Sequence, residues 1–117
     1  MQSKGRQFRE LLKQPGILIT PGVYDGYSVR LVERAGFRMG AISGAGVSES
    51  RLGWADRGVM TFETNLDNAR RLADCCDNLL LRADADTGYG NSMNVHFVVR
   101  AFEKAGMAAL MFEDQVW

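Results

Sequence analysis

Histidine and cysteine are scarce in the 117-residue sequence, which contains one histidine and two cysteines. The cysteines, Cys75 and Cys76, are adjacent, and neighbouring residues on a helix do not face each other, so neither a disulfide framework nor a CxxC site is indicated. We expect both on a helix in a reducing compartment, with Cys76 buried. Because His96 is the single histidine, a zinc site built from histidines or a histidine triad within these residues is excluded. We expect His96 on a helix surface.

An excess of one charge and long apolar runs are also missing. The 14 basic and 14 acidic residues balance, and no basic block occurs, so neither nucleic acid nor an anionic membrane is an expected partner. No apolar run approaches the roughly 20 residues of a membrane span. The N-terminal sequence MQSKGRQFRELL has no apolar signal core, and the expected location is the cytoplasm.

What the sequence does contain is an alternation of helical and strand patterns. Apolar spacing, capping residues and the Pro-Gly or Gly breaks predict helices and strands by turns. Helices are expected at 3–14, from Asp25 or Gly26 to Gly36, from Thr61 through Cys76, and from Asn91 or Ser92 to Gly106; strands at 17–20, 39–43, 79–83 and 108–112; and a loop of small residues at 44–48.

This order predicts an α/β fold with a parallel sheet made of βαβ units. Each unit has roughly 30 residues, the size found in an eight-stranded β/α barrel of about 250 residues. Four parallel strands, three intervening helices and an N-terminal helix would then form the N-terminal half of a (β/α)8 TIM-type barrel. We therefore expect residues 1–117 to be one partial barrel domain of a longer protein. The alternative is a complete small domain with a four-stranded open sheet.

The most informative stretch is Leu79–Asn91, with the sequence LLLRADADTGYGN. Residues two apart on a strand share a face, so Asp84 and Asp86 are expected to point the same way from its C-terminal end. Two neighbouring carboxylates repel each other unless a cation or a shared proton relieves them. The stretch by itself fits a hard-cation site and also fits a solvated Asp-rich turn that caps the following helix.

Other polar and small residues fall at the ends of the remaining predicted strands. Ser43, Gly44 and Ala45 follow the second strand, Glu113 follows the fourth, and Asp56 lies on the long loop after the second. In a β/α barrel all strand C-terminal ends meet on the face that holds the active site. Acids from separate strands on one rim favour the cation site over a solitary acidic turn.

Three motifs together resemble those of the isocitrate lyase/phosphoenolpyruvate mutase superfamily: DADTGYGN, SGAGVS followed by LGWAD, and FEDQ. Their order and spacing match over nearly the whole chain. The resemblance implies a β/α barrel with Mg²⁺ at the strand ends. Asp84 and Asp86 match the magnesium-site aspartates, Asp86 being the closer ligand. Asp56 and Glu113 match acids that hold the ion largely through water.

The resemblance also implies a substrate site and an activity. Ser43, Gly44 and Ala45 match the loop that holds the carboxylate or phosphonate end of the substrate. The Gln in FEDQ favours the branch that contains the short-chain lyases and the carboxyphosphonoenolpyruvate mutases, and disfavours phosphoenolpyruvate mutase itself. Within that branch we expect a methylisocitrate-lyase-like carbon–carbon lyase acting on a small 2-hydroxy or 2-oxo di- or tricarboxylate through an enolate. A carboxyphosphonoenolpyruvate phosphonomutase or an oxaloacetate decarboxylase is the alternative, and an inactive fragment or interaction module is an alternative of another class.

In the resembling lyases, a mobile loop just after the EDQ strand supplies a catalytic cysteine. The sequence ends at Trp117, before that loop, so the catalytic group is expected outside these residues and residues 1–117 alone are expected to be inactive. Cys75 and Cys76 are not expected to replace it. The family commonly forms tetramers, so a homo-oligomer is expected for the full-length protein.

Overall fold

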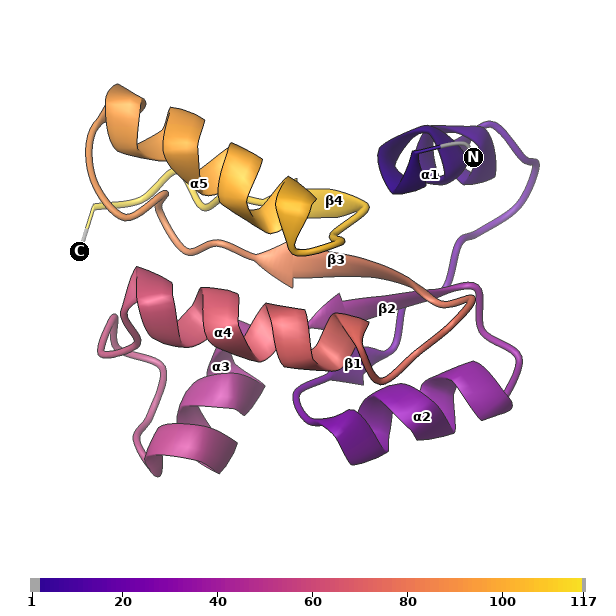
Figure 1. Cartoon of the computed structure of the whole chain (residues 1–117), viewed down its shortest axis with the longest axis horizontal. Helices are drawn as coiled ribbons and strands as arrows, with labels where there is room; N and C mark the ends of the chain where they lie inside the picture. Colours follow the sequence, from indigo (N-terminus) through magenta and orange to yellow (C-terminus); the bar gives the residue numbers. More distant parts are fainter. Residues whose placement is uncertain (1–2, 117) are drawn as a thin grey trace.

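Four short parallel strands form the centre of the molecule, whose computed structural model describes residues 3–116. They are β1 (Gly22–Val23), β2 (Met39–Ile42), β3 (Leu80–Asp84) and β4 (Ala109–Met111), side by side in the order of the sequence (Figure 1). Each pairs in parallel with the next, so Arg82 of β3 lies between Ala41 and Ala109. The predicted α/β class with four parallel strands is confirmed.

The helices begin where the sequence offers a capping side chain. They are α1 (Lys4–Leu12), α2 (Gly26–Arg34), α3 (Gly44–Val47), α4 (Phe62–Ala73) and α5 (Ser92–Lys104), with a π-helical segment at Ser48–Leu52. The side chain at each N-cap accepts a backbone N–H of the first turn, which satisfies a donor that has no partner inside the helix; these caps are Ser3, Asp25, Ser43, Thr61 and Asn91. Within residues 3–116 no helix is long and apolar enough to cross a membrane.

The first strand does not lie where the apolar pattern predicts it. The predicted strand at 17–20 is wrong: Ile17 and Ile19 are 92% and 62% exposed, and this segment pairs with no strand. Pairing starts later, because the Ala41 N–H donates to the Pro21 carbonyl and the Ser43 N–H donates to that of Val23. An apolar run without a pairing partner remains irregular, whatever its β propensity.

The segment of small residues at 44–48 is helical and not a loop. The Ser43 hydroxyl accepts the Gly46 N–H at 3.0 Å, and the Ser43 carbonyl accepts the Val47 N–H at 2.9 Å. One capped turn therefore follows β2 directly and becomes α3. The expectation of a loop is wrong because glycine-rich sequence can still form a turn when a serine caps it.

The two cysteines do not lie on a helix as predicted. Helix α4 ends at Ala73, and Cys75 and Cys76 follow in the turn before β3, both half-buried and both free thiols. Burial raises the pKa of Cys76 to about 11, so its thiol is protonated at neutral pH. His96, as predicted, is exposed on α5.

The core has two parts, one on each face of the sheet. The larger lies between the sheet and α2, α4 and α5, and includes Val29, Leu72, Leu81 and Phe102. The smaller lies under the N-terminal ends of β2, β3 and β4, where Leu11 and other residues of α1 cover them. In Figure 1, α1 accordingly lies at one end of the strands, while α3 and the segment that follows β4 lie at the other.

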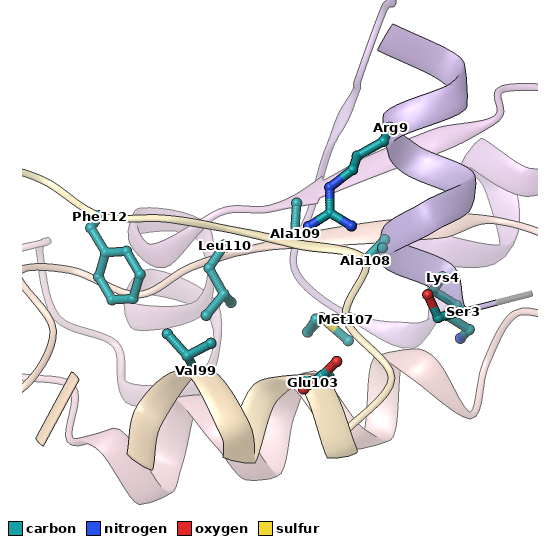
Figure 2. A pocket seen from close by; sticks show the side chains of 11 residues that line it. Ser3, Lys4, Arg9, Val99, Glu103, Met107, Ala108, Ala109, Leu110 and Phe112 are labelled. Atoms are coloured by element: carbon teal, nitrogen blue, oxygen red, sulfur yellow. The ribbon is translucent and has the colours of Figure 1, made fainter. Parts of the chain in front are cut away.

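A cavity of about 460 Å³ borders the outer edge of β4, between α1 and α5 (Figure 2). Its lining combines the charged side chains of Lys4, Arg9 and Glu103 with apolar residues such as Val99 and Phe112. None of the acids predicted for the strand ends lines it. The cavity therefore does not coincide with the candidate functional site.

Candidate functional site

Backbone hydrogen bonds join the ends of β3 and β4. The Ala85 N–H donates to the Met111 carbonyl at 2.9 Å, and the Glu113 N–H donates to the Asp86 carbonyl at 2.8 Å. The pairing of the two strands thus continues past their last residues. It places Glu113 beside Asp86, as the parallel sheet predicts, and Gln115 donates from its side-chain amide to the Glu113 carboxylate.

Asp84 and Asp86 are neighbours, but for a different reason than strand alternation. Asp86 lies beyond β3 with a φ of 47°, a left-handed conformation that non-glycine residues adopt infrequently. Its N–H donates to the Asp84 carboxylate at 3.1 Å. The alternation argument is therefore wrong for Asp86, and a turn closed by the Asp84 side chain brings the two acids together.

The charges of neighbouring acids raise the pKa values of two carboxylates at this strand end, Asp86 and Glu113. Asp86 is only 8% exposed, and burial, followed by the nearby charges of Asp84 and Asp56, raises its pKa; a hydrogen bond from Tyr89 opposes that rise. The pKa of Glu113 is raised by desolvation and then by Asp84, Asp56 and Asp86. The structure thus brings together all four acids predicted for the metal.

Asp56 reaches the rim from the loop between the π-helical segment and α4. Ser48 is buried, and its hydroxyl donates to the Trp54 carbonyl at 2.9 Å, which ties the loop back to the helical segment. Gly53 ends that segment with a φ of 72°, where glycine is favoured. Asp56 itself is exposed.

The predicted substrate loop lies against the acids. A Cβ atom added to Gly44 would lie 2.9 Å from the Asp84 Oδ2 atom, so the backbone of α3 approaches that carboxylate as closely as only glycine allows. Ser43, Gly44 and Ala45 form the N-cap and first turn of α3. The structure places these three residues at the same rim as the acids.

Two residues at this site were not predicted as functional. Asn65 of α4 is fully buried, and its amide nitrogen donates to the Asp84 carbonyl and to the Tyr89 hydroxyl, both at 2.7 Å. The Tyr89 hydroxyl in turn lowers the pKa of the Asp86 carboxyl, against the rise that burial causes. The one sequence signal for Asn65 is a polar residue within the apolar stripe of α4, beside Leu66.

The donor set fits a hard cation. All four acidic groups offer oxygen, and none of the three ion pairs found within residues 3–116 involves them. No three acidic, histidine or cysteine side chains of the described residues are placed to hold one ion directly. Such a set matches an ion that keeps several of its waters, as Mg²⁺ does.

A parallel β/α sheet with acids and a short capped helix at the carboxyl ends of its strands is typical of β/α-barrel enzymes, whose active sites lie at that end. Comparison with known proteins identifies the family: the profile described as Phosphoenolpyruvate phosphomutase matches residues 8–116. The chain belongs to this family, and the resemblance to the isocitrate lyase/phosphoenolpyruvate mutase superfamily is confirmed.

Relatives of the chain have several activities. It is 39% identical to the chloroplastic carboxyvinyl-carboxyphosphonate phosphorylmutase of Arabidopsis thaliana over 95% of this chain and 33% of that protein. It is also 39% identical to 2-methylisocitrate lyase of Salmonella typhimurium, over 99% of this chain and 39% of that protein. A solved phosphonopyruvate hydrolase in complex with oxalate and Mg²⁺ superposes with a TM-score of 0.91 at 31% identity, covering 99% and 40% of the two chains.

The chain thus spans 33–40% of the length of these relatives. Over that span its strands and helices match those of the superfamily's barrel proteins, which supports the predicted half-barrel fold. The names of the relatives support a lyase or mutase family and leave the particular reaction open.

Proposed function

We propose that the protein is a Mg²⁺-dependent carbon–carbon lyase, similar to methylisocitrate lyase, that acts on a small 2-hydroxy or 2-oxo di- or tricarboxylate. The observation that carries the proposal is the rim at which hydrogen bonds join Asp86 to Asp84 and to Glu113. The charge of Asp56 raises the pKa values of Asp86 and Glu113 there, and none of the four acids forms an ion pair with a described basic residue. A rim of like charges is unfavourable by itself and becomes favourable when a cation binds.

In this proposal Asp86 and Asp84 would hold the ion, Asp86 as the closer ligand, and Asp56 and Glu113 would hold it largely through water. When bound, Mg²⁺ would supply Lewis-acid stabilisation of the negative charge that develops on a substrate oxygen as the carbon–carbon bond breaks. The buried position of Asp86 limits the access of bulk water to this carboxylate. The Tyr89 hydroxyl keeps it oriented by a hydrogen bond.

The carboxylate end of the substrate is proposed to bind at Ser43, Gly44 and Ala45. The first backbone N–H groups of a helix have no acceptor inside it, and small side chains let an anion approach them. Because Gly44 abuts Asp84, an anion held there would lie next to the cation. The same residues could hold a phosphonate, which is the geometry that a mutase needs.

A phosphonomutase is the second candidate, because the chain is 39% identical both to the Arabidopsis phosphorylmutase and to the Salmonella lyase. The four acids and the α3 turn serve both reactions. A homotetramer stays a prediction that follows from the family resemblance, and a cytoplasmic location stays a prediction that follows from the N-terminal sequence.

The test uses protein translated from the complete reading frame. Calorimetric titration with Mg²⁺ is followed by assays with 2-methylisocitrate, carboxyphosphonoenolpyruvate and oxaloacetate. We expect cleavage of 2-methylisocitrate that stops when EDTA is added and returns with Mg²⁺. Turnover of only one of the other two compounds would move the protein to the mutase or decarboxylase branch. A protein that binds no Mg²⁺ would contradict the proposal altogether.

A further inference from the structure

Helix α4 contacts the acidic rim through one fully buried side chain. The Asn65 amide nitrogen donates to the carbonyl of Asp84, 19 residues away, and to the hydroxyl of Tyr89, 24 residues away, each at 2.7 Å. Only the amide nitrogen can donate to that carbonyl, so the Asp84 contact fixes which way the amide lies. Asn65 thus holds both ends of the segment from Asp84 to Tyr89.

Tyr89 extends this contact to the buried aspartate. Its hydroxyl accepts from Asn65 at 2.7 Å and lies close enough to Asp86 to lower the pKa of that carboxyl. Its ring lies 5.6 Å from that of Phe62, another residue of α4. Two residues of one helix therefore fix the tyrosine that orients Asp86.

The segment that Asn65 holds is strained. Within residues 3–116, Asp86 (φ 47°) and Tyr89 (φ 61°) are the non-glycine residues with positive φ, and both lie in this turn. Such conformations are unfavourable and persist when the surroundings hold them. Gly88, between them, has a φ of 96°, and a Cβ atom there would lie 2.5 Å from the Val95 side chain. Tertiary contacts therefore hold the turn against its own preference.

The same helix provides a matched comparison. Asn68 lies three residues along α4, is 7% exposed, and has an amide nitrogen without a hydrogen-bond partner in the described part of the chain. No hydrogen bond joins it to the turn in residues 3–116. Both asparagines are buried on α4, but only Asn65 hydrogen-bonds to the turn between Asp84 and Tyr89 in the described part of the chain.

We propose that Asn65 is a positioning residue that holds the Asp84–Tyr89 turn in the conformation that presents both aspartates to one cation. The proposal rests on the magnesium site proposed above. Asn65 itself contacts neither the ion nor the substrate and acts through the Asp84 backbone and the Tyr89 hydroxyl. Groups that orient the ligands of a metal typically change its affinity by about 10–100-fold when they are removed.

The experiment is a double-mutant cycle in protein from the complete reading frame. The variants are Asn65→Leu, Tyr89→Phe, their combination, and Asn68→Leu as the control. Calorimetry gives the dissociation constant for Mg²⁺, and amide hydrogen exchange in EDTA reports the order of residues 84–89 without metal. Tyr89→Phe keeps the ring packed on Phe62 and serves as the second probe if Asn65→Leu does not fold.

We expect Asn65→Leu to weaken Mg²⁺ binding by about 10-fold or more and to speed exchange at the amides of Asp86 and Gly88. The loss of Mg²⁺ binding free energy in the double variant should be smaller than the sum of the losses in the two single variants, because Asn65 acts partly through Tyr89. Asn68→Leu should leave both readouts as in the wild type. Unchanged exchange and unchanged affinity in Asn65→Leu would overturn the proposal, as would an equal effect of Asn68→Leu.

The two proposals fail in different ways. A wild-type protein that binds no Mg²⁺ contradicts the metal site, and exchange in EDTA then still decides whether Asn65 orders the turn. If the wild-type protein binds Mg²⁺ and Asn65→Leu has wild-type affinity and wild-type exchange, the role of Asn65 is contradicted and the metal site is not. If neither Asn65→Leu nor the double variant folds, Tyr89→Phe decides: wild-type affinity and exchange in that variant would overturn the proposal.

Discussion

Acidic residues at the two ends of the sheet have opposite surroundings. At the end where β3 begins, one carboxylate oxygen of Glu33 accepts the N–H groups of residues 77, 78 and 79 at 3.0, 2.6 and 3.1 Å. At the end where β3 stops, Asp86 is buried among other acids. The hydrogen bonds, that of Asn78 first, lower the pKa of Glu33, whereas burial raises the pKa of Asp86.

The difference separates stabilising acids from functional ones. Ionised Glu33 stabilises the folded chain, because folding provides donors for its charge. Ionised Asp86 destabilises it, because folding removes water and adds like charges. A group that is unfavourable in the free protein and becomes favourable with a bound cation is typical of a functional site.

Of the substitutions that test this difference between Asp86 and Glu33, removing the charge of Asp86 should have the largest effect. In Asp86→Asn we expect Mg²⁺ affinity to fall by about 100-fold or more, because the nearest proposed ligand loses its charge. The metal-free variant should be no less stable than the wild type at neutral pH. Calorimetry and urea denaturation in EDTA measure the two quantities, and wild-type Mg²⁺ affinity in this variant would contradict the assignment.

The pH dependence of the same variant has a defined sign. A raised pKa means that folded Asp86 holds its proton more tightly than unfolded Asp86, so the contribution of Asp86 to the stability of the metal-free protein falls as the pH rises from the ordinary value of 3.8 through the folded value. Asp86→Asn should lack this fall. Denaturation curves from pH 3.5 to 7 in EDTA, compared between the two proteins, provide the test.

Crowding the substrate turn should have the next largest effect. In Gly44→Ala the new Cβ would lie 2.9 Å from Asp84 Oδ2, so the carboxylate has to move. We expect Mg²⁺ affinity to fall by about 10-fold, although alanine is otherwise the better helix residue. The control is Gly22→Ala in β1, where no atom lies within 4 Å of the added Cβ. Equal affinities for the two variants would show that the Gly44–Asp84 contact does not matter.

Removing Glu33, at the end of the sheet where β3 begins, should have the smallest effect on stability and no effect on Mg²⁺ binding. Glu33→Ala leaves three backbone N–H groups without their acceptor, and we expect it to cost about 1–2 kcal/mol of unfolding free energy with unchanged Mg²⁺ affinity. The exposed Glu10, which pairs with Lys13 at 2.9 Å, is the control, and Glu10→Ala should change stability by less than about 0.5 kcal/mol.

Acid conditions sharpen the prediction for Glu33. Its lowered pKa means that its stabilising contribution is fully present above the ordinary value of 4.5 and is lost as the pH falls through the folded value. The difference in stability between the wild type and Glu33→Ala should therefore shrink as the pH falls below about 4.5. A difference that stays constant down to pH 3 would contradict an ionic role for this carboxylate.

Local signals in the sequence predicted most of the fold. The caps at Asp25, Thr61 and Asn91, and the alternation of elements, depend on residues close together in the chain, and the structure confirms them. The strand at 17–20 was wrong because pairing depends on which segment meets β2 across the chain. Helix α4 stops at Ala73, before Cys76, and the spacing of apolar residues alone does not mark that end.

The candidate site could be predicted as a set of residues and not as a geometry. Motif resemblance brought Asp84, Asp86 and Glu113 together, and the structure places them at one rim. The left-handed turn at Asp86 was missed because alternation assumes that a strand continues. Asn65 was missed because its partners are 19 and 24 residues away. Its only local sign was a polar residue on an otherwise apolar helix face.

The strained turn between β3 and α5 has a consequence for the order of folding. The turn needs the Asn65 amide to hold it, and that amide arrives with α4, so the rim cannot form before α4 has docked on the sheet. The ability to bind Mg²⁺ should therefore appear late during refolding, after most of the helical circular dichroism signal has returned. In stopped-flow refolding with a Mg²⁺ indicator, the rate of Mg²⁺ uptake would then report the rate of the last packing step.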